Sequence, residues 1–385
     1  MTGTPFWPRR SPAFLRARRA VRGMLDDVHA HPGRPATSNE PGVVVGLSGG
    51  ADSLALTAAC AAEAGSVHAV VVDHGLQDGS AQVADRAAAT ARSFGATAEV
   101  VRVTVPGGDG DGVATGSVGG PEAAARTVRH EALHRVARDL GRPLLLAHTL
   151  DDQAETVLLG LARGAGPAAL SGMAADRTWD DGVRVLRPFL RSGASNPDGP
   201  LRRADTVAAC AELGVEAWHD PHNDDPRYAR VRVRATALPL LEELLGPGVA
   251  ENLVRTADLV RADADALDAW AGEAGGGGDE LAADDVAKFP EAVRTRVLKN
   301  WAEANGAGAL TTAHVRALDA LLARRRGHGP VALPSAHTPA HPGDRLVAYR
   351  KGGTLAVSRG FTGDAATARR TRSEPGPRTQ AVEPQ

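Results

Sequence analysis

A glycine-rich segment near residue 50 combines the residue types that bind a polyphosphate. Residues 46–53 have the sequence GLSGGADS, between an apolar run at 43–45 and an Ala-rich run at 54–60. This pattern predicts a strand, a tight turn and a helix N-terminus, whose unpaired N–H groups and dipole attract an anion. Glycine also lets the backbone approach a phosphate closely. The predicted phosphate-binding residues are Ser48, Gly49, Gly50, Ala51, Asp52 and Ser53.

A second group of polar residues follows the fourth predicted strand. Residues 147–156 have the sequence AHTLDDQAET, in which Asp152 and Glu155 stand three positions apart and share a helix face. His148 stands just before that helix. One interpretation is that the acids complement the helix dipole, with Thr149 and Asp152 forming a capping box. Because the group would lie beside the phosphate loop, we favour a second interpretation, in which the carboxylates and the imidazole face the ligand.

The elements that must position these groups alternate between β-rich runs and helical segments. This alternation predicts an α/β fold, an open parallel sheet with helices on both faces, and ligands then bind at the carboxyl ends of the strands. Asp73 and His74 follow the second strand and would meet the nucleoside. The predicted strands are Val43–Leu47, Val67–Val72, Glu99–Val105, Leu144–Ala147 and Val183–Leu186. The predicted helices are Asp52–Ala64, Ala81–Phe94 and Pro121–Leu140.

Changes in composition divide the chain into four parts. They are a basic extension at 1–40, a nucleotide-binding and catalytic domain at 41–235, a smaller mainly helical domain at 236–360 and a disordered tail at 361–385. The extension is expected to hold a short basic helix at Phe14–Val28. Within the smaller domain, 329–359 resemble short strands, and the Gly/Asp-rich stretch Gly107–Gly120 predicts a mobile loop.

The bulk composition limits the partners and the location. The formal net charge is −2, so a nucleic-acid site must be a local basic patch. Cys60 and Cys210 form no CxxC pair or disulfide framework, which fits a reducing compartment. No apolar run approaches the ~20 residues of a membrane span, and the Arg-rich N-terminus lacks the apolar stretch of a secretory signal. We therefore expect a cytoplasmic protein with no membrane partner.

The order of the motifs indicates a family. The loop lacks the Lys of a Walker A motif, and S-G-G-x-D-S resembles the PP-loop of the N-type ATP pyrophosphatases. Over roughly residues 42–325 the chain resembles the short form of tRNA(Ile)-lysidine synthase. The further motifs, in order, are VDHGL (72–76), EAAARTVR (122–129), HTLDDQAET (148–156), RGAG (163–166), RPFL (187–190), WHDPHND (218–224) and YARVRVR (228–234).

Three positions depart from the family pattern. Thr149 stands in place of a second His, His130 in place of a Tyr, and Val231 in place of an Asn. The first departure removes one expected site contact. The third weakens an Arg-Asn-Arg signature that is associated with tRNA contact.

The resemblance implies a two-step reaction that uses ATP, Mg²⁺, free L-lysine and a tRNA(Ile) with a CAU anticodon. ATP would adenylate the C2 oxygen of the wobble cytidine and release pyrophosphate, and the lysine ε-amine would then attack C2 and release AMP. The implied catalytic residues are Asp52, which would hold Mg²⁺ through the pyrophosphate, and the lysine-binding group His148, Asp152 and Glu155. The implied ATP contacts outside the loop are Asp73, His74, Arg126 and Arg163. The resemblance leaves open whether the protein forms a homodimer.

Arg230, Arg232 and Arg234 are the implied contacts with the tRNA backbone. In a strand all three would share one face, whereas in a helix Arg230 and Arg234 alone would do so. A solvated basic stretch is the alternative.

Other function classes fit the chain less well. A thiolase-like tRNA-modifying enzyme with the same loop needs grouped cysteines, which Cys60 and Cys210 do not provide. A non-catalytic nucleotide-binding module would not need the carboxylates. The run HEALH at 130–134 matches the H-E-x-x-H pattern of zinc peptidases, but it lies in a stretch that the family resemblance explains.

Overall fold

The computed structural model describes residues 7–8, 10–30, 42–75, 79–104, 120–164, 166–193, 196–275, 278–323, 329–336 and 344–361. The chain divides into two compact units, Met1–Arg261 and Ala262–Gln385. Two expectations lie almost wholly outside the described residues. They are the mobile loop at Gly107–Gly120 and the disordered tail at 361–385.

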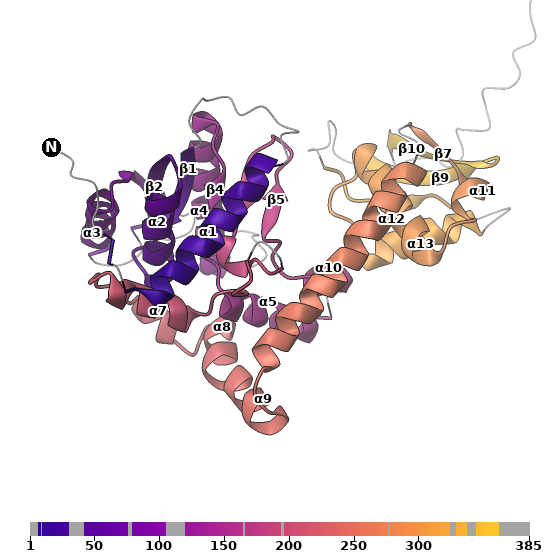
Figure 1. The fold of residues 1–385 in the computed structure, drawn as a ribbon. Helices are drawn as coiled ribbons and strands as arrows, with labels where there is room; N and C mark the ends of the chain where they lie inside the picture. Colours follow the sequence, from indigo (N-terminus) through magenta and orange to yellow (C-terminus); the bar gives the residue numbers. More distant parts are fainter. Residues whose placement is uncertain are drawn as a thin grey trace, which may run out of the picture. The chain divides into compact units, whose positions relative to one another are not determined.

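The first unit is built on a six-stranded sheet with the strand order β3-β2-β1-β4-β6-β5 (Figure 1). The strands are β1 (Gly42–Leu47), β2 (Ser66–Asp73), β3 (Thr97–Arg102), β4 (Leu144–Leu145), β5 (Asp176–Thr178) and β6 (Arg184–Leu186). The first five strands in this order, β3, β2, β1, β4 and β6, pair in parallel. The edge strand β5 is antiparallel to β6. This confirms the predicted parallel sheet. Strand β5 was not predicted, because its three residues are polar and exposed and lack an apolar pattern.

Helices cover both faces of this sheet. They are α1 (Pro12–Ala30), α2 (Ala51–Glu63), α3 (Ser80–Ser93), α4 (Gly120–Leu140), α5 (Leu150–Ala162), α6 (Pro167–Leu170) and α7 (Arg203–Glu212), with 3-10 turns η1 (Pro188–Leu190) and η2 (Pro221–Asp224). Val43 and Val45 of β1 pack in one core with α1, α2, α3 and α7, whereas Val44 packs with Leu133 of α4 in another. Alternate side chains of a strand point to opposite faces, so β1 anchors both layers.

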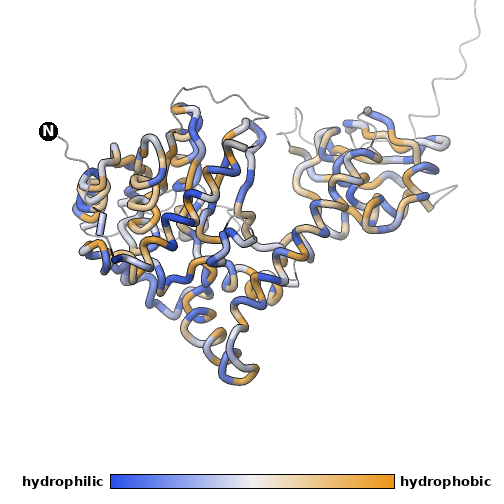
Figure 2. Tube along the Cα trace, viewed as in Figure 1, coloured by the Kyte–Doolittle hydropathy of each residue, from blue (hydrophilic) through white to orange (hydrophobic). Residues whose placement is uncertain are grey.

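Helix α1 belongs to the body of the first unit, which differs from the predicted separate extension at 1–40. Phe14, Ala17 and Val21 lie on one helix face and are buried in the core with α2 and α7. Arg18 and Arg22 pair with Glu63 at the end of α2. The Arg-rich sequence predicted a short basic helix, and the apolar residues between the arginines recur at helical spacing and form a core face. Hydrophobic and hydrophilic residues alternate along this and the neighbouring helices in Figure 2.

The first unit also continues beyond the predicted boundary at residue 235. It includes α8 (Ala229–Arg232), the π-helical segment η3 (Val233–Ala237), α9 (Leu238–Leu245) and the start of α10 (Val249–Ala274). Leu238, Ala250 and Val254 pack against Leu150 and Ala154 of α5. These contacts complete the apolar face of α5 and place the division of the chain at Arg261.

The second unit combines helices with a four-stranded antiparallel sheet of order β7-β10-β9-β8. Its elements are β7 (Glu280–Ala282), α11 (Ala283–Val286), α12 (Glu291–Ala304), α13 (Thr312–Leu322), β8 (Val331–Leu333), β9 (Asp344–Lys351) and β10 (Thr354–Phe361). Leu298, Leu318 and Leu355 are among its buried core residues. The expected short strands over 329–359 are present. Among the described residues, none of the helices is both long and apolar enough to cross a lipid bilayer.

Candidate active site

The turn between β1 and α2 consists of Ser48, Gly49 and Gly50 and leaves the N-terminus of α2 open. Gly49 has a φ of +85°, and a Cβ there would lie 3.3 Å from the Cβ of Ala87, so glycine is favoured at this position. Gly50 is the N-cap of α2, and no described side chain caps this helix. The N–H groups of its first turn can therefore bind an anion, and this geometry fits the polyphosphate of ATP.

The hydroxyl of Ser53 supports the loop from inside. Its buried Oγ accepts a hydrogen bond from the Ser48 N–H (3.1 Å) and donates one to the Gly50 carbonyl (2.9 Å). The exposed Ser48 Oγ lies 3.1 Å from the Ser53 Oγ. Ser53 therefore maintains the loop conformation, and Ser48 is the hydroxyl that can meet a ligand.

Asp52 stands in the first turn of α2 and contacts α7. Thr206 Oγ1 donates a hydrogen bond to Asp52 Oδ1, and Arg203 Nε lies 3.6 Å from Oδ2. Burial raises the pKa of Asp52 to about 6, against the opposing effect of the Thr206 hydrogen bond. With 27% of its side chain exposed, Asp52 is a charged carboxylate at neutral pH that solvent can still reach. These properties fit a ligand for Mg²⁺.

The raised pKa of Asp52 predicts a pH dependence of stability in the absence of ATP and Mg²⁺. The unfolded state ionises near the ordinary value of 3.8 and the folded state near about 6, so unfolding stability should fall as the pH rises through this window. The difference between these two pKa values corresponds to roughly 3 kcal/mol of unfolding free energy. Because Asn cannot ionise, the Asp52→Asn variant should gain stability relative to wild type between about pH 4 and about pH 7. Urea unfolding at several pH values measures this, and a constant difference would contradict the raised pKa.

Arg203, the first residue of α7, joins the phosphate loop to α5. Its guanidinium lies 3.6 Å from Asp52, 2.7 Å from Asp152 and 3.8 Å from Glu155. Arg234 lies 2.7 Å from Glu155 and 3.8 Å from Asp152. We call these five residues the carboxylate cluster. Its three carboxylates and two guanidinium groups leave one formal negative charge, so it still attracts a further cation.

Asp152 is both a helix cap and a member of the carboxylate cluster. Its Oδ2 accepts hydrogen bonds from the N–H (2.9 Å) and Oγ1 (3.0 Å) of Thr149, and Thr149 Oγ1 accepts one from the Asp152 N–H, which completes a capping box. Its Oδ1 accepts a hydrogen bond from Arg203. Burial alone would raise the pKa of Asp152, but Arg203 and Thr149 outweigh burial and hold the pKa below its usual range. The capping interpretation is confirmed, and Oδ1 still faces the cluster.

Glu155 is fully buried and held by Arg234 at two points. Arg234 Nε donates to Oε1 at 2.7 Å and Nη2 donates to Oε2 at 3.2 Å. A buried carboxylate needs such a partner to stay charged, and a bidentate guanidinium is a strong one. A ligand ammonium would reach Glu155 by replacing one of the arginine contacts.

His148 lies beside the carboxylate cluster as a neutral imidazole. Arg187 Nε donates a hydrogen bond to His148 Nδ1 at 3.2 Å, which leaves the ring proton on Nε2. Burial, together with the charge of Arg187, holds the pKa of His148 well below its usual range. At neutral pH this ring is a hydrogen-bond donor. It therefore differs from the expected third partner of an ammonium group, which would have to be an acceptor.

Asp73 and His74 lie at the carboxyl end of β2. Asp73 Oδ1 accepts a hydrogen bond from the Gly75 N–H at 3.0 Å, and Arg129 Nε donates to His74 Nε2 at 3.1 Å. The proton of His74 is then on Nδ1, which is buried and has no hydrogen-bond partner among the described residues. An unpaired donor at the end of a parallel strand fits a site for part of a nucleotide.

The two remaining arginines expected to contact ATP lie in different places. Arg126 is on α4, close enough for its charge to lower the pKa of His148. Arg163 is exposed and follows the last turn of α5, about 20 Å along the helix axis from the end that carries Asp152. The structure therefore does not bring Arg163 to the carboxylate cluster.

Arg230, Arg232 and Arg234 lie in a helical segment, α8 followed by η3. Arg230 donates a hydrogen bond to Thr156 Oγ1 at 3.2 Å and Arg234 donates to Glu155, so both face α5. Arg232 donates to two backbone carbonyls of the preceding loop, at 2.6 and 2.8 Å. The helical alternative is correct, but the face that Arg230 and Arg234 share points toward α5 and not to open solvent.

Sequence patterns did not predict Arg203 or Thr206 as site residues, nor a bond from Arg187 to His148. Arg203 and Thr206 reach the loop because α7 packs beside α2, which no local spacing reveals. The RPFL motif was the one signal for Arg187.

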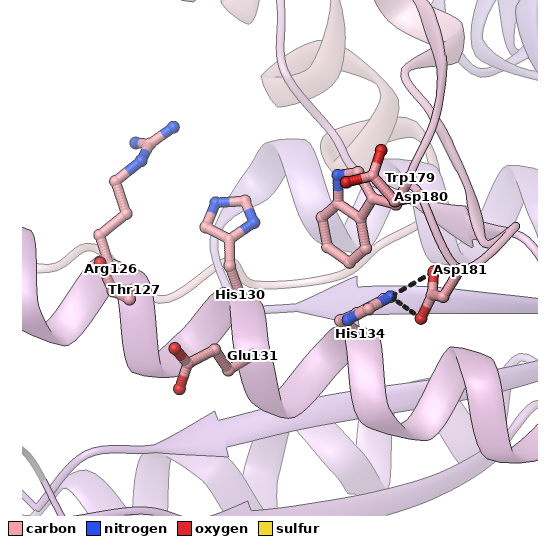
Figure 3. Close-up of a pocket in the computed structure, with 8 residues that line it drawn as sticks. All are labelled: Arg126, Thr127, His130, Glu131, His134, Trp179, Asp180 and Asp181. Atoms are coloured by element: carbon pink, nitrogen blue, oxygen red, sulfur yellow. Dashed lines mark hydrogen bonds and ion pairs between the residues drawn. The ribbon is translucent and has the colours of Figure 1, made fainter. Parts of the chain in front are cut away.

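The H-E-x-x-H segment lies on α4 and borders a pocket (Figure 3), but its two histidines point to different partners. His134 Nε2 lies 2.9 Å from the Asp181 carboxylate, whereas His130 projects toward another part of the pocket. In the described part of the chain, no group of three or more His, Cys, Asp or Glu side chains is arranged to hold a metal ion.

We therefore expect the purified protein to carry no stoichiometric zinc. Elemental analysis of the protein, with the His130→Ala variant as the control, measures this directly. About one zinc per chain in wild type, lost in the variant, would restore the peptidase interpretation.

The two cysteines are buried at separate positions, Cys60 on α2 and Cys210 on α7. Burial raises the pKa of both thiols, that of Cys210 to about 11. Both are therefore protonated and poor nucleophiles at neutral pH, which disfavours thiolase-like chemistry.

Comparisons with known proteins find two matching domain families and several similar enzymes. A PP-loop domain matches residues 24–241, and a TilS substrate binding domain matches residues 281–352. The tRNA(Ile)-lysidine synthase of Leifsonia xyli subsp. xyli is 49% identical over 309 residues, which are 76% of this chain and 85% of the relative. The same enzyme of Rhodococcus erythropolis is 47% identical over 351 residues, 90% of this chain and 95% of the relative. That of Mycobacterium tuberculosis is 47% identical over 324 residues, 82% of this chain and 90% of the relative. With this similarity across most of its length, the chain belongs to the tRNA(Ile)-lysidine synthase family.

Proposed function

We propose that this protein uses ATP to join the ε-amine of free L-lysine to C2 of the wobble cytidine in a tRNA(Ile) with a CAU anticodon. The products would be lysidine in the tRNA, AMP and pyrophosphate. The family is one of ATP-dependent ligases. The observation that carries the residue assignment is the meeting of an uncapped PP-loop helix with the carboxylate cluster, through Arg203.

The first step is the transfer of AMP to the cytidine C2 oxygen. The open N-terminus of α2 and Ser48 would bind the departing pyrophosphate, while His74 Nδ1 would meet the nucleoside. Asp52 would hold Mg²⁺, which supplies charge neutralisation for the pyrophosphate. Arg126, which lies on α4, would bind a phosphate of ATP.

The second step is the attack of lysine on the adenylated C2. Asp152 and Glu155 would bind the lysine ammonium, since the cluster retains one formal negative charge after pairing with its arginines. His148, as a neutral donor, would orient a substrate oxygen beside them. In the absence of lysine, Arg203 and Arg234 take the place of the ammonium.

The tRNA would contact more than the reacting base. We assign residues 262–360 a tRNA-binding role, in line with the substrate binding domain matched there. Of the three arginines expected to contact the tRNA, the exposed Arg232 would contact a phosphate, whereas Arg230 and Arg234 face α5. A tRNA substrate and two unpaired cysteines fit a cytoplasmic location.

The test is pyrophosphate release from ATP with Mg²⁺, a CAU-anticodon tRNA(Ile) transcript and each amino acid in turn. We expect lysine alone to be incorporated into the tRNA, and a transcript with uridine at the wobble position to be inactive. ATP binding without turnover would instead indicate a nucleotide-binding module. Incorporation of sulfur or of another amine would indicate a different tRNA-modifying enzyme.

A further inference from the structure

A pocket of about 600 Å³ lies in the first unit between α4 and the turn that follows β5 (Figure 3). Arg126 and His130 of α4 line one part of it, and Trp179 of the turn lines another. Apart from Arg126, none of its residues has a role in the proposed reaction. A volume of this size accepts a small ligand or a single nucleotide.

Trp179 forms a fixed aromatic wall of this pocket. The His134 ring lies edge-on to the indole with centroids 3.8 Å apart and an interplanar angle of 84°. Asp181 in turn holds His134, with Nε2 to carboxylate distances of 2.9 and 3.1 Å. The backbone N–H of Trp179 also donates to the Val183 carbonyl at 2.9 Å, which closes the turn. The half-buried indole is therefore held in place before any ligand arrives.

His130 provides a second ring across the pocket. Figure 3 shows it projecting from α4 between Arg126 on one side and Trp179 on the other. Burial, together with the charge of Arg126, lowers the pKa of His130 to about 4. The ring is thus neutral at pH 7 and offers one donor and one acceptor nitrogen. The pocket therefore has two aromatic surfaces and a cation, and the carboxylates of Glu131, Asp180 and Asp181 also line it.

These features favour one class of ligand. Unpaired bases of RNA are bound by stacking on aromatic side chains, by hydrogen bonds to their edges and by cations near their phosphates. We infer that this pocket binds an unpaired nucleobase of the substrate anticodon loop, stacked on Trp179 and next to His130. The inference rests on the proposed function, because that function supplies the RNA.

The position of the pocket agrees with a base close to the reacting cytidine. Arg126 and His130 are both close enough to His148 to influence its pKa, so this end of the pocket lies on the side of His148. His134 stands eight residues after Arg126 on α4, or about 12 Å along the axis. The pocket thus leads away from the reaction site over a distance that one or two nucleotides of a loop can span.

The test is a comparison of protein and RNA changes in one binding assay. Binding of a CAU anticodon stem-loop is measured for wild type, Trp179→Phe and Trp179→Leu, with each loop nucleotide replaced in turn by an abasic one. Trp179→Leu keeps apolar packing but loses the stacking surface, so we expect it to bind the intact stem-loop about 10-fold more weakly. Trp179→Phe should stay within about 3-fold of wild type. One abasic position should weaken wild type and leave Trp179→Leu unaffected.

Further variants separate this inference from a folding defect. His130→Ala removes the opposite ring without touching the packing of Trp179, and it should lose sensitivity to the same abasic position. Leu140→Ala, at an exposed position of the same helix, is the matched control and should bind like wild type.

Unchanged binding by Trp179→Leu and His130→Ala, or abasic penalties that persist in both, would overturn the inference. Lysine incorporation by wild type reports the proposed function separately. An enzyme that modifies tRNA normally but ignores both substitutions would refute the pocket alone.

Discussion

The Asp52→Asn variant should fold normally and form pyrophosphate from ATP roughly 10²- to 10³-fold more slowly than wild type. Asp52 is the carboxylate nearest the open end of α2, where the charge of the leaving pyrophosphate and its Mg²⁺ must be balanced. Asn preserves the shape and the contact with Thr206 but removes the negative charge. Pyrophosphate release with tRNA and lysine present measures the effect, and circular dichroism verifies the fold.

Two further substitutions make this result specific. Ser53→Ala should also be inactive, because Ser53 ties the Ser48 N–H and the Gly50 carbonyl together inside the loop. Glu63→Gln is the matched control, since Glu63 is a carboxylate at the far end of the same helix that pairs with α1. It should retain activity. Near wild-type turnover by a folded Asp52→Asn protein would remove this residue from the mechanism.

The Glu155→Gln variant should lose lysine transfer more than it loses adenylation. Adenylation needs tRNA, ATP and Mg²⁺, whereas the second step needs a charged partner for the lysine ammonium. Losing that partner should cost ~2–4 kcal/mol, or roughly 30- to 1000-fold in the use of lysine. Exchange of labelled pyrophosphate into ATP, with tRNA but without lysine, measures the first step alone. Incorporation of lysine into tRNA measures the whole reaction.

The capping box offers a control for this second experiment. Thr149→Ala removes the cap of α5 but keeps the charge of Asp152, whereas Asp152→Asn removes the charge but keeps the Thr149 cap. If the cluster binds lysine, Asp152→Asn should impair lysine transfer far more than Thr149→Ala does. Equal effects would mean that Asp152 acts through the helix cap. Equal loss of both reaction steps in Glu155→Gln would assign that residue to the nucleotide site.

The sequence predicted the parts of the site that depend on short stretches of chain. The PP-loop lies between a buried strand and a helix, and α5 begins with the expected acids, because both features follow from neighbouring residues. The parallel sheet was predictable for the same reason, since apolar runs such as Val43–Leu47 recur between helical segments.

The parts that were missed depend on contacts between distant segments. Arg203 meets Asp52 and Asp152 because the chain returns to the phosphate loop after a long intervening segment. The sequence around Arg203 would look the same if its side chain were exposed to solvent. The capping and ligand-facing interpretations of Asp152 could not be separated in advance, because its two oxygens serve different partners.

Helix α7 connects the amino-terminal helix to the phosphate loop. Its last residue, Glu212, accepts hydrogen bonds from two N–H groups in the first turn of α1 (3.1 and 2.9 Å), while Arg203 and Thr206 at its other end contact the loop. A protein that started at residue 42, where the sheet starts, would expose the apolar surface that α1 covers and release one end of α7. A shortened protein that keeps α7 anchored at both ends must therefore include α1, which begins at Pro12.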